Sequence, residues 1–155
     1  MVPSAATAGD ESELHWSANL KGTVDEARKE LARTGRRQFV FIDYTGVTCT
    51  NCQINERNVF SRDDVRKLFR EYWLVQQYTD EVRPEFYAQA VDKERREQEA
   101  EANLSFQNDR FGDIQLPLYV VIEVLPDKLA LRGKYDEGKI NDVGKFLEFL
   151  RKSKE

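Results

Sequence analysis

The stretch FVFIDYTGVTCTNC, residues 39–52, decides how this chain folds. Its first four residues, Phe39–Ile42, form an unbroken apolar run of β-forming residues, which predicts a strand buried on both faces. A short connection follows and ends at a C-x-x-C pair, Cys49 and Cys52, and residues 49–58 are compatible with a helix. The order of strand, short loop, cysteine pair and helix favours redox chemistry at the two sulfurs.

The segments on either side of this stretch alternate between helix and strand. Apolar residues at helical spacing predict a helix over residues 23–33, and Ser61–Asp64 resembles a capping box that opens a further helix. Residues 73–78 are rich in β-formers and are expected to form the next strand. The order α, β, α, β predicts an α/β fold with parallel strands joined by a right-handed crossover.

The second half of the chain predicts a helical insertion, a hairpin and a closing helix. Opposite charges recur at helical spacing within residues 80–113, which we interpret as an inserted, solvated helix with surrounding loops. Leu116–Ile122 and Leu129–Arg132 are separated by a turn and predict two hairpin strands. Residues 140–150 carry one apolar helical stripe and predict the last helix.

The composition limits the class of protein. The chain has 155 residues, 34% charged and 40% hydrophobic, as expected for one compact soluble domain. Residues 1–13 offer nothing to bury, so we expect a disordered lead-in there and a single domain over residues 14–155. A net charge of −4 without a basic block argues against nucleic acid as a partner.

Membrane insertion and export are also not indicated. No apolar run approaches the roughly 18 residues of a membrane span. Residues 1–10 lack the basic start and the apolar region of a signal peptide. We therefore expect that this chain does not itself span a membrane, and that it works outside the cytoplasm only as a piece of a longer protein.

The spacing of the two cysteines suits a disulfide that opens and closes. On one helix face, residues three apart lie close enough for a disulfide. At the first helical turn, free backbone N–H groups would stabilise a thiolate at Cys49, whereas Cys52 lies deeper and should be the less acidic thiol. Cys49 would then attack a partner's disulfide, and Cys52 would resolve the mixed disulfide. A structural zinc site, for which His15 is the remaining ligand of the usual kind, and an incidental buried pair are the alternatives.

These features resemble the thioredoxin family over nearly the whole chain from about Trp16. The resemblance implies a thioredoxin-like α/β fold, with a central mixed sheet flanked by helices and a charged helical insertion before the cis-proline strand. Asp43, six residues before Cys49, matches the family's buried acid, which handles the proton of the inner cysteine. Pro117, which follows Leu116, matches the cis-proline that faces the disulfide and presents its backbone to an extended partner.

Within this family, residues 43–60 are most similar to the C-terminal domain of the DsbD family of membrane thiol:disulfide interchange proteins. Glu56 matches an acidic position of that domain. With Asp43 it would form a pair of carboxylates that raises the pKa of the thiols. Gln76 stands where thioredoxin has a lysine, which would leave Asp43 without a cationic neighbour.

The other departures from the family pattern lie where a partner would dock. Thr48 replaces the tryptophan that usually precedes the first cysteine, and the inner dipeptide is Thr50-Asn51. We expect these three residues, with Leu116 and Pro117, to form the substrate-binding surface. Because the inner dipeptide tunes the reduction potential, that potential does not follow from the resemblance.

The resemblance implies a thiol–disulfide oxidoreductase that acts as a protein-disulfide reductase. Its partners would be other thiol or disulfide proteins, and its electrons would come from a membrane-embedded donor domain. The setting would be periplasmic and would include cytochrome c biogenesis. The Cys49–Cys52 disulfide would be the only redox group, without a metal or organic cofactor, and the domain would be a monomer. The alternatives are a free-standing, cytoplasmic reductase or oxidant, and a binding module that uses the groove beside Pro117 without turnover.

Overall fold

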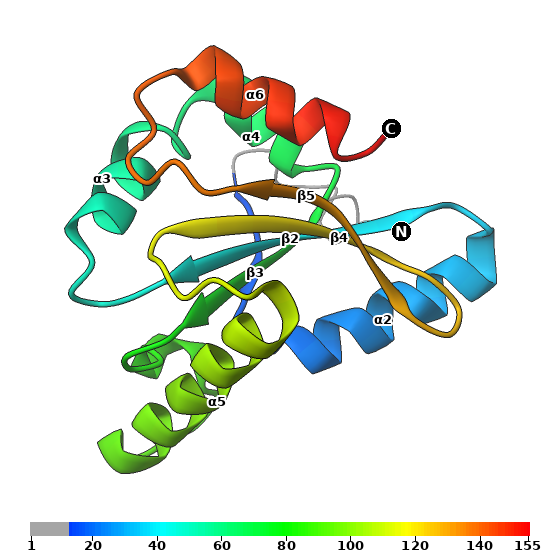
Figure 1. Ribbon diagram of the computed structural model, residues 1–155. Coiled ribbons are helices and arrows are strands. Elements are labelled where there is room, and N and C mark those ends of the chain that lie inside the picture. Colours follow the sequence, from blue (N-terminus) through cyan, green and yellow to red (C-terminus); the bar gives the residue numbers. More distant parts are fainter. Residues whose placement is uncertain (1–12) are drawn as a thin grey trace.

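The computed structural model describes residues 13–155, so the lead-in expected at residues 1–13 lies outside the described residues except for Glu13. Helices and strands alternate around one sheet (Figure 1). In chain order the elements are β1 (Trp16–Ser17), α2 (Leu20–Thr34), β2 (Gln38–Thr45), α3 (Thr50–Asn58), α4 (Asp63–Phe69), β3 (Trp73–Tyr78), the 3-10 helix η1 (Pro84–Phe86), α5 (Lys93–Phe111), β4 (Leu118–Val124), β5 (Leu129–Tyr135) and α6 (Val143–Lys152). The predicted helices and strands are all present.

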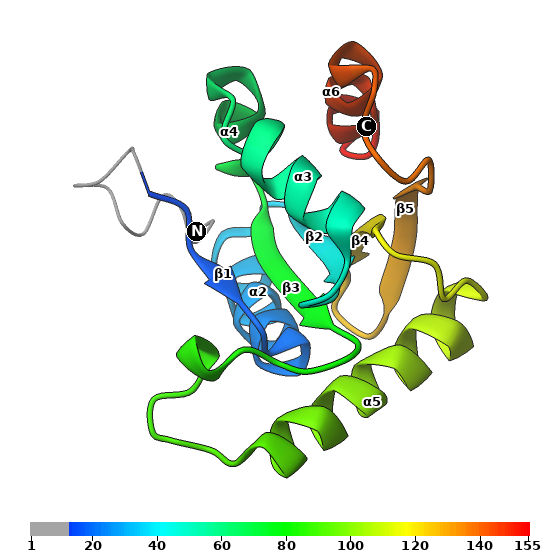
Figure 2. The same cartoon turned by 90° about the vertical axis from the view of Figure 1, so that its left-hand side faces the viewer.

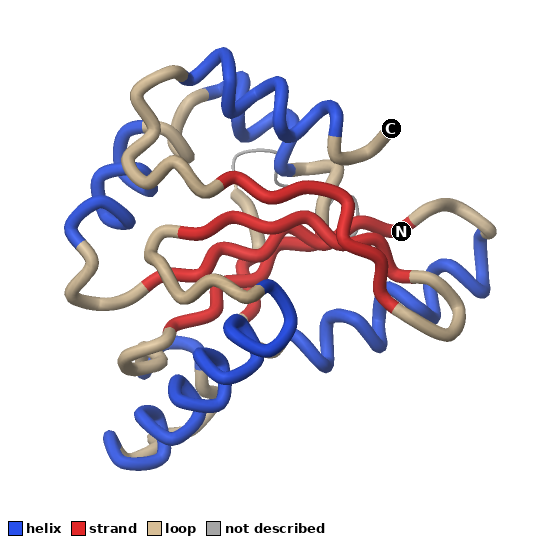
Figure 3. Tube along the Cα trace, viewed as in Figure 1, coloured by secondary structure: helices blue, strands red, loops and turns tan. Residues whose placement is uncertain are grey.

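The strands form one mixed sheet in the order β1-β3-β2-β4-β5. Both β1 and β2 pair with β3 in parallel, whereas β4 runs antiparallel to β2 and to β5. Helices α3, α4 and α6 cover one face of this sheet, and α2 and α5 lie on the other, as Figures 1 and 3 show. The predicted architecture, a mixed sheet with helices on both faces, is confirmed, and so is the β4–β5 hairpin.

The central strand β2 is buried along its whole length because each of its faces meets a separate apolar cluster. Phe39 and Phe41 belong to the cluster under α4 and α6, where the ring centroids of Phe41 and Phe69 lie 4.9 Å apart. Val40 and Ile42 belong to the cluster that α2 covers. This explains why the strand is apolar at consecutive positions rather than at alternate ones.

The charged insertion forms α5, a helix of 19 residues that begins at an Asp92 N-cap and ends at Gly112. Gly112 has a φ of 65°, a left-handed conformation that favours glycine at a helix end. The chain then passes through a cis Leu116–Pro117 peptide bond into β4, which confirms the cis isomer that the resemblance implied. Among residues 13–155, no helix combines the length and the apolar character needed to cross a membrane.

The capping box predicted at Ser61–Asp64 is wrong. Helix α4 begins at Asp63, its N-cap is Arg62, and no side chain caps it. The Ser61 hydroxyl instead donates to the carbonyl oxygen of Arg57 at 2.7 Å, at the end of the preceding helix. The serine therefore closes one helix rather than opening the next.

Candidate active site

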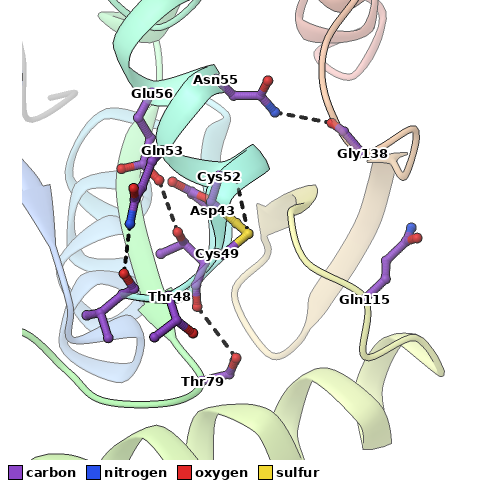
Figure 4. The surroundings of a disulfide bond; sticks show 12 residues. Asp43, Thr48, Cys49, Cys52, Gln53, Asn55, Glu56, Thr79, Gln115 and Gly138 are labelled. Carbon is purple, nitrogen blue, oxygen red and sulfur yellow. Dashed lines mark hydrogen bonds between the residues drawn. A yellow bond between two sulfur atoms is a disulfide. The ribbon is translucent and has the colours of Figure 1, made fainter.

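The disulfide Cys49–Cys52 lies where the central strand β2 gives way to helix α3 (Figure 4). Cys49 is the N-cap of α3, and its sulfur accepts a hydrogen bond from the backbone N–H of Cys52 at 3.2 Å. Cys49 is partly exposed, whereas Cys52 is fully buried. The outer sulfur is therefore open to a partner, and it sits where backbone N–H groups favour a thiolate when the bond is reduced.

The zinc alternative fails on geometry. His15 immediately precedes β1, whose Trp16 pairs with Leu74 near the start of β3, whereas Cys49 follows the far end of β2. His15 therefore lies away from the cysteines. Within residues 13–155, no three or more His, Cys, Asp and Glu residues gather in a group that could hold a metal ion.

Two carboxyl groups lie near the disulfide, that of Asp43 on β2 and that of Glu56 on α3 (Figure 4). Asp43 is fully buried on β2; its Oδ2 accepts from the Gln76 side-chain amide at 3.2 Å. No hydrogen-bond partner among the described residues reaches its Oδ1. Burial, together with the nearby charge of Glu56, raises the pKa of Asp43 well above its ordinary value, and the Gln76 hydrogen bond offsets only part of this.

Glu56 is the second carboxyl of the pair. Its Oε2 accepts from the Thr45 hydroxyl at 3.0 Å. Burial raises the pKa of Glu56, whereas the Thr45 hydrogen bond and the charge of Arg83 lower it. Both acids are therefore harder to ionise than usual, and the charge of Glu56 adds to the cost of ionising Asp43.

Asp80, which was not among the residues predicted from the sequence, holds the loop ahead of Cys49. Its Oδ1 accepts from the backbone N–H of Val47 at 3.1 Å, and its Oδ2 accepts from the backbone N–H and the hydroxyl of Thr48 at 3.3 Å each. The Gln53 amide donates to the carbonyl oxygen of Val47 at 2.7 Å from the other side. Because β2 and β3 are parallel, the residues that follow them meet at one edge of the sheet, and this rule could have pointed to Asp80.

Asn55, which was also not predicted from the sequence, is a fully buried residue that links α3 to distant parts of the chain. Its amide nitrogen donates to the Tyr119 hydroxyl at 2.8 Å and to the carbonyl oxygen of Gly138 at 3.1 Å. Its amide oxygen accepts from the backbone N–H of Ile140 at 2.9 Å. The helix that carries both cysteines is thereby fixed against β4 and against the loop ahead of α6.

The residues expected to meet a partner differ in their exposure to solvent. Thr48, Thr50 and Asn51 are exposed, Leu116 is half-buried, and Pro117 is buried. Gly46 shows how closely these segments approach one another. A Cβ atom at Gly46 would lie 3.0 Å from Asp80 Oδ2 and 3.3 Å from Leu116 Cδ1, so the cysteine loop and the cis-proline segment are in direct contact.

Residues 18–123 match the family of thioredoxin-like proteins. The chain belongs to the thioredoxin-like family. The matched region includes the Cys49–Cys52 disulfide. The family and the disulfide together identify a thioredoxin-like oxidoreductase fold.

Two solved structures have the same fold. A thioredoxin from Thermus thermophilus is 19% identical, with a TM-score of 0.57, and the match covers 89% of this chain and 85% of that one. A DsbH oxidoreductase is 12% identical, with a TM-score of 0.59, and the match covers 90% and 85%. At these identities the likeness concerns the fold alone. No curated protein matches the chain.

Proposed function

We propose that this chain is a protein-disulfide reductase that passes electrons through Cys49 and Cys52. One observation carries the proposal: a partly exposed cysteine at the N-cap of a helix is bonded to a fully buried cysteine one turn further on. An accessible thiol attacks first and a sheltered thiol resolves, which is the division of labour that disulfide exchange requires.

The reaction moves two electrons from the reduced cysteine pair to the partner. The Cys49 thiolate attacks one sulfur of the partner's disulfide; a mixed disulfide forms, the partner's bond breaks, and the released sulfur takes up a proton. Cys52 then loses its proton and attacks the Cys49 sulfur. The Cys49–Cys52 disulfide forms, and the second partner sulfur leaves as a thiolate that is protonated in turn.

We assign the proton of Cys52 to the acidic pair. Asp43 and Glu56 both lie on the inner side of α3, and both have a raised pKa because of their burial. A carboxylate with a raised pKa is a better base for a thiol than an exposed one. Gln76 supports Asp43 with a hydrogen bond in place of the lysine charge of thioredoxin.

The partners in this proposal are proteins with thiols or disulfides. An extended segment would lie across Leu116 and Pro117 and would meet the exposed Thr48, Thr50 and Asn51. We further propose that residues 14–155, with the insertion at about 80–113, act as one monomeric domain of a DsbD-type protein. Electrons would then come from a membrane-embedded donor domain, in the periplasm, and cytochrome c biogenesis is among the processes that such a domain would serve.

The variant Cys52→Ala tests the exchange mechanism directly. When the reduced variant is mixed with a disulfide-containing peptide, we expect a mixed disulfide through Cys49 that accumulates and is released by dithiothreitol. Cys49→Ala is the control and should form no such adduct. If Cys52→Ala binds the peptide without forming a covalent bond, the chain is a binding module and the reductase proposal is wrong.

The reduction potential tests the direction of electron flow. A potential near the ~−270 mV of thioredoxin supports a reductase, whereas a value near ~−120 mV indicates an oxidant. A titration of the oxidised chain against glutathione measures it. Addition of purified donor domains of the DsbD type tests the finer assignment, because only a matched donor should reduce the disulfide rapidly.

A further inference from the structure

Helix α5 places two amide side chains, Asn103 and Gln107, among apolar residues such as Phe106 that pack against the core. Ala100 and Gln107 are buried on this helix, and Asn103 lies between them at helical spacing. The side-chain oxygen of Gln107 is buried, and no hydrogen-bond partner in the described part of the chain reaches it. A buried amide that is only half satisfied destabilises a fold. Stability therefore does not explain why this position carries glutamine.

Each amide donates to a backbone carbonyl at the end of the sheet where β2 leads into the cysteine loop. Asn103 Nδ2 reaches the carbonyl oxygen of Tyr78, the last residue of β3, at 2.9 Å. Gln107 Nε2 reaches the carbonyl oxygen of Gln115, two residues ahead of Pro117, at 3.0 Å. Figure 2 shows α5 running along the sheet from the end of β3 to the segment that leads into β4. One helix thus contacts the chain on both sides of β2.

Gln115 lies on the segment that faces the disulfide (Figure 4). Its backbone N–H donates to Asp113 Oδ1 at 2.9 Å, and its side-chain amide donates to the carbonyl oxygen of Asp136 at 2.9 Å. Gln115 itself is exposed, so water competes for these two contacts, whereas Gln107 bonds its carbonyl from the buried side. Of these three hydrogen bonds, the one from Gln107 is therefore the best sheltered from water.

We propose that Gln107 is a positioning residue for partner binding: its bond to Gln115 holds the backbone beside Pro117 where an extended peptide can lie across it and bring its disulfide to Cys49. The inference rests on the proposed reductase function. It gives the charged insertion a role, which is to shape the partner groove rather than to tune the thiols.

The test compares Gln107→Met with Gln98→Met, the same change at an exposed position of the same helix. Methionine matches glutamine in size but cannot donate a hydrogen bond. The pre-reduced proteins react in single turnover with two probes, a peptide whose disulfide is flanked by several residues, and dithiobis-nitrobenzoate, which has no backbone to dock. For Gln107→Met we expect the half-saturating peptide concentration to rise about three- to tenfold, the effect of one lost hydrogen bond. The limiting rate and the nitrobenzoate rate should stay unchanged.

The outcomes separate the possibilities. If Gln107→Met behaves like Gln98→Met with the peptide, or if both probes slow down together, Gln107 does not position the groove and the inference is wrong. If the wild-type protein reduces neither probe, the reductase function itself has failed. Should the methionine variant not fold, Gln107→Ala gives the same comparison, because its side chain is too short to reach Gln115.

Discussion

The buried acid Asp43 should make the folded protein less stable as the pH rises. In the unfolded chain an aspartate ionises with a pKa of about 3.9. In the folded protein the pKa of Asp43 is raised, so its carboxyl group keeps its proton at pH values where the unfolded chain has already lost it. The folded state then binds one proton more than the unfolded state. Stability therefore falls as the pH rises, and it stops falling once the pH passes the folded pKa.

The size of this effect follows from the single proton involved. Between the two pKa values, the free energy of unfolding should fall by up to about 1.4 kcal/mol per pH unit. Asp43→Asn keeps the shape of the side chain and an oxygen for the Gln76 hydrogen bond, but it cannot ionise. Near pH 4 the variant and the wild type should have similar free energies of unfolding. Above pH 4 the variant should become increasingly more stable than the wild type, and this difference should stop growing once the pH passes the folded pKa of Asp43.

Denaturant unfolding of the oxidised protein between pH 4 and pH 8 measures this difference, and the disulfide keeps both thiols from titrating. Glu56→Gln is the comparison. Thr45 and Arg83 offset part of the rise that burial causes in the pKa of Glu56. The difference in unfolding free energy between Glu56→Gln and the wild type should therefore level off at a smaller value. The reasoning is refuted if the difference in unfolding free energy between Asp43→Asn and the wild type does not change with pH. It is also refuted if the wild type becomes more stable relative to the variant as the pH rises.

Three further predictions concern stability, each measured by denaturant unfolding at pH 7 unless stated. Asn55→Ala should lose about 2–4 kcal/mol because it leaves buried partners unpaired, whereas Asn58→Ala, at an exposed position of the same helix, should change little. Gly133→Ala should lower the free energy of unfolding by about 1–3 kcal/mol, because the added Cβ would collide with Ser153 and lie 2.9 Å from the Phe149 ring. Gly144→Ala is the control: its Cβ meets only Asp142, at 3.3 Å, so this change should be neutral or slightly stabilising. Glu123→Gln should lose about 1–3 kcal/mol because Arg37 and Arg132 lower the pKa of Glu123; this loss should shrink as the pH falls below about 4, and a loss that persists in acid would contradict it.

Local patterns in the sequence predicted the elements, because each depends on residues close together in the chain. Each of these patterns predicts the structure of its own segment: the apolar run at residues 39–42, the cysteine pair, and the apolar stripe of the last helix. The resemblance to thioredoxin added Asp43 and Pro117, which no local pattern would have joined to the cysteines. The capping box predicted at Ser61 was wrong although the sequence motif matched, because the Ser61 hydroxyl donates to a carbonyl oxygen of the preceding helix instead.

The missed residues act over long distances in the chain. The partners of Asn55 lie 64, 83 and 85 positions away, and no spacing rule links them to a helix residue three positions after Cys52. Asp80 differs, because the parallel pairing of β2 and β3 sets the residues after both strands side by side. The topology inferred from the alternating elements would therefore have been enough to predict a role for Asp80. Only the three-dimensional structure could reveal Asn55.

Two buried polar groups with an unpaired oxygen lie at the end of the sheet that carries the disulfide, and this placement argues for a functional role. The carboxyl of Asp43 and the amide of Gln107 are both fully buried, and each keeps one oxygen without a hydrogen-bond partner among the described residues. The apolar clusters on the two faces of β2 supply the stability that offsets them.

If both groups are kept for their chemistry, Asp43→Asn and Gln107→Met should each leave the fold intact and yet impair a different step of the reaction. The aspartate variant should slow the resolution of the mixed disulfide, whereas the glutamine variant should weaken its formation with a peptide. Loss of the same step in both variants would mean that the two groups act only through the general packing of this end of the sheet.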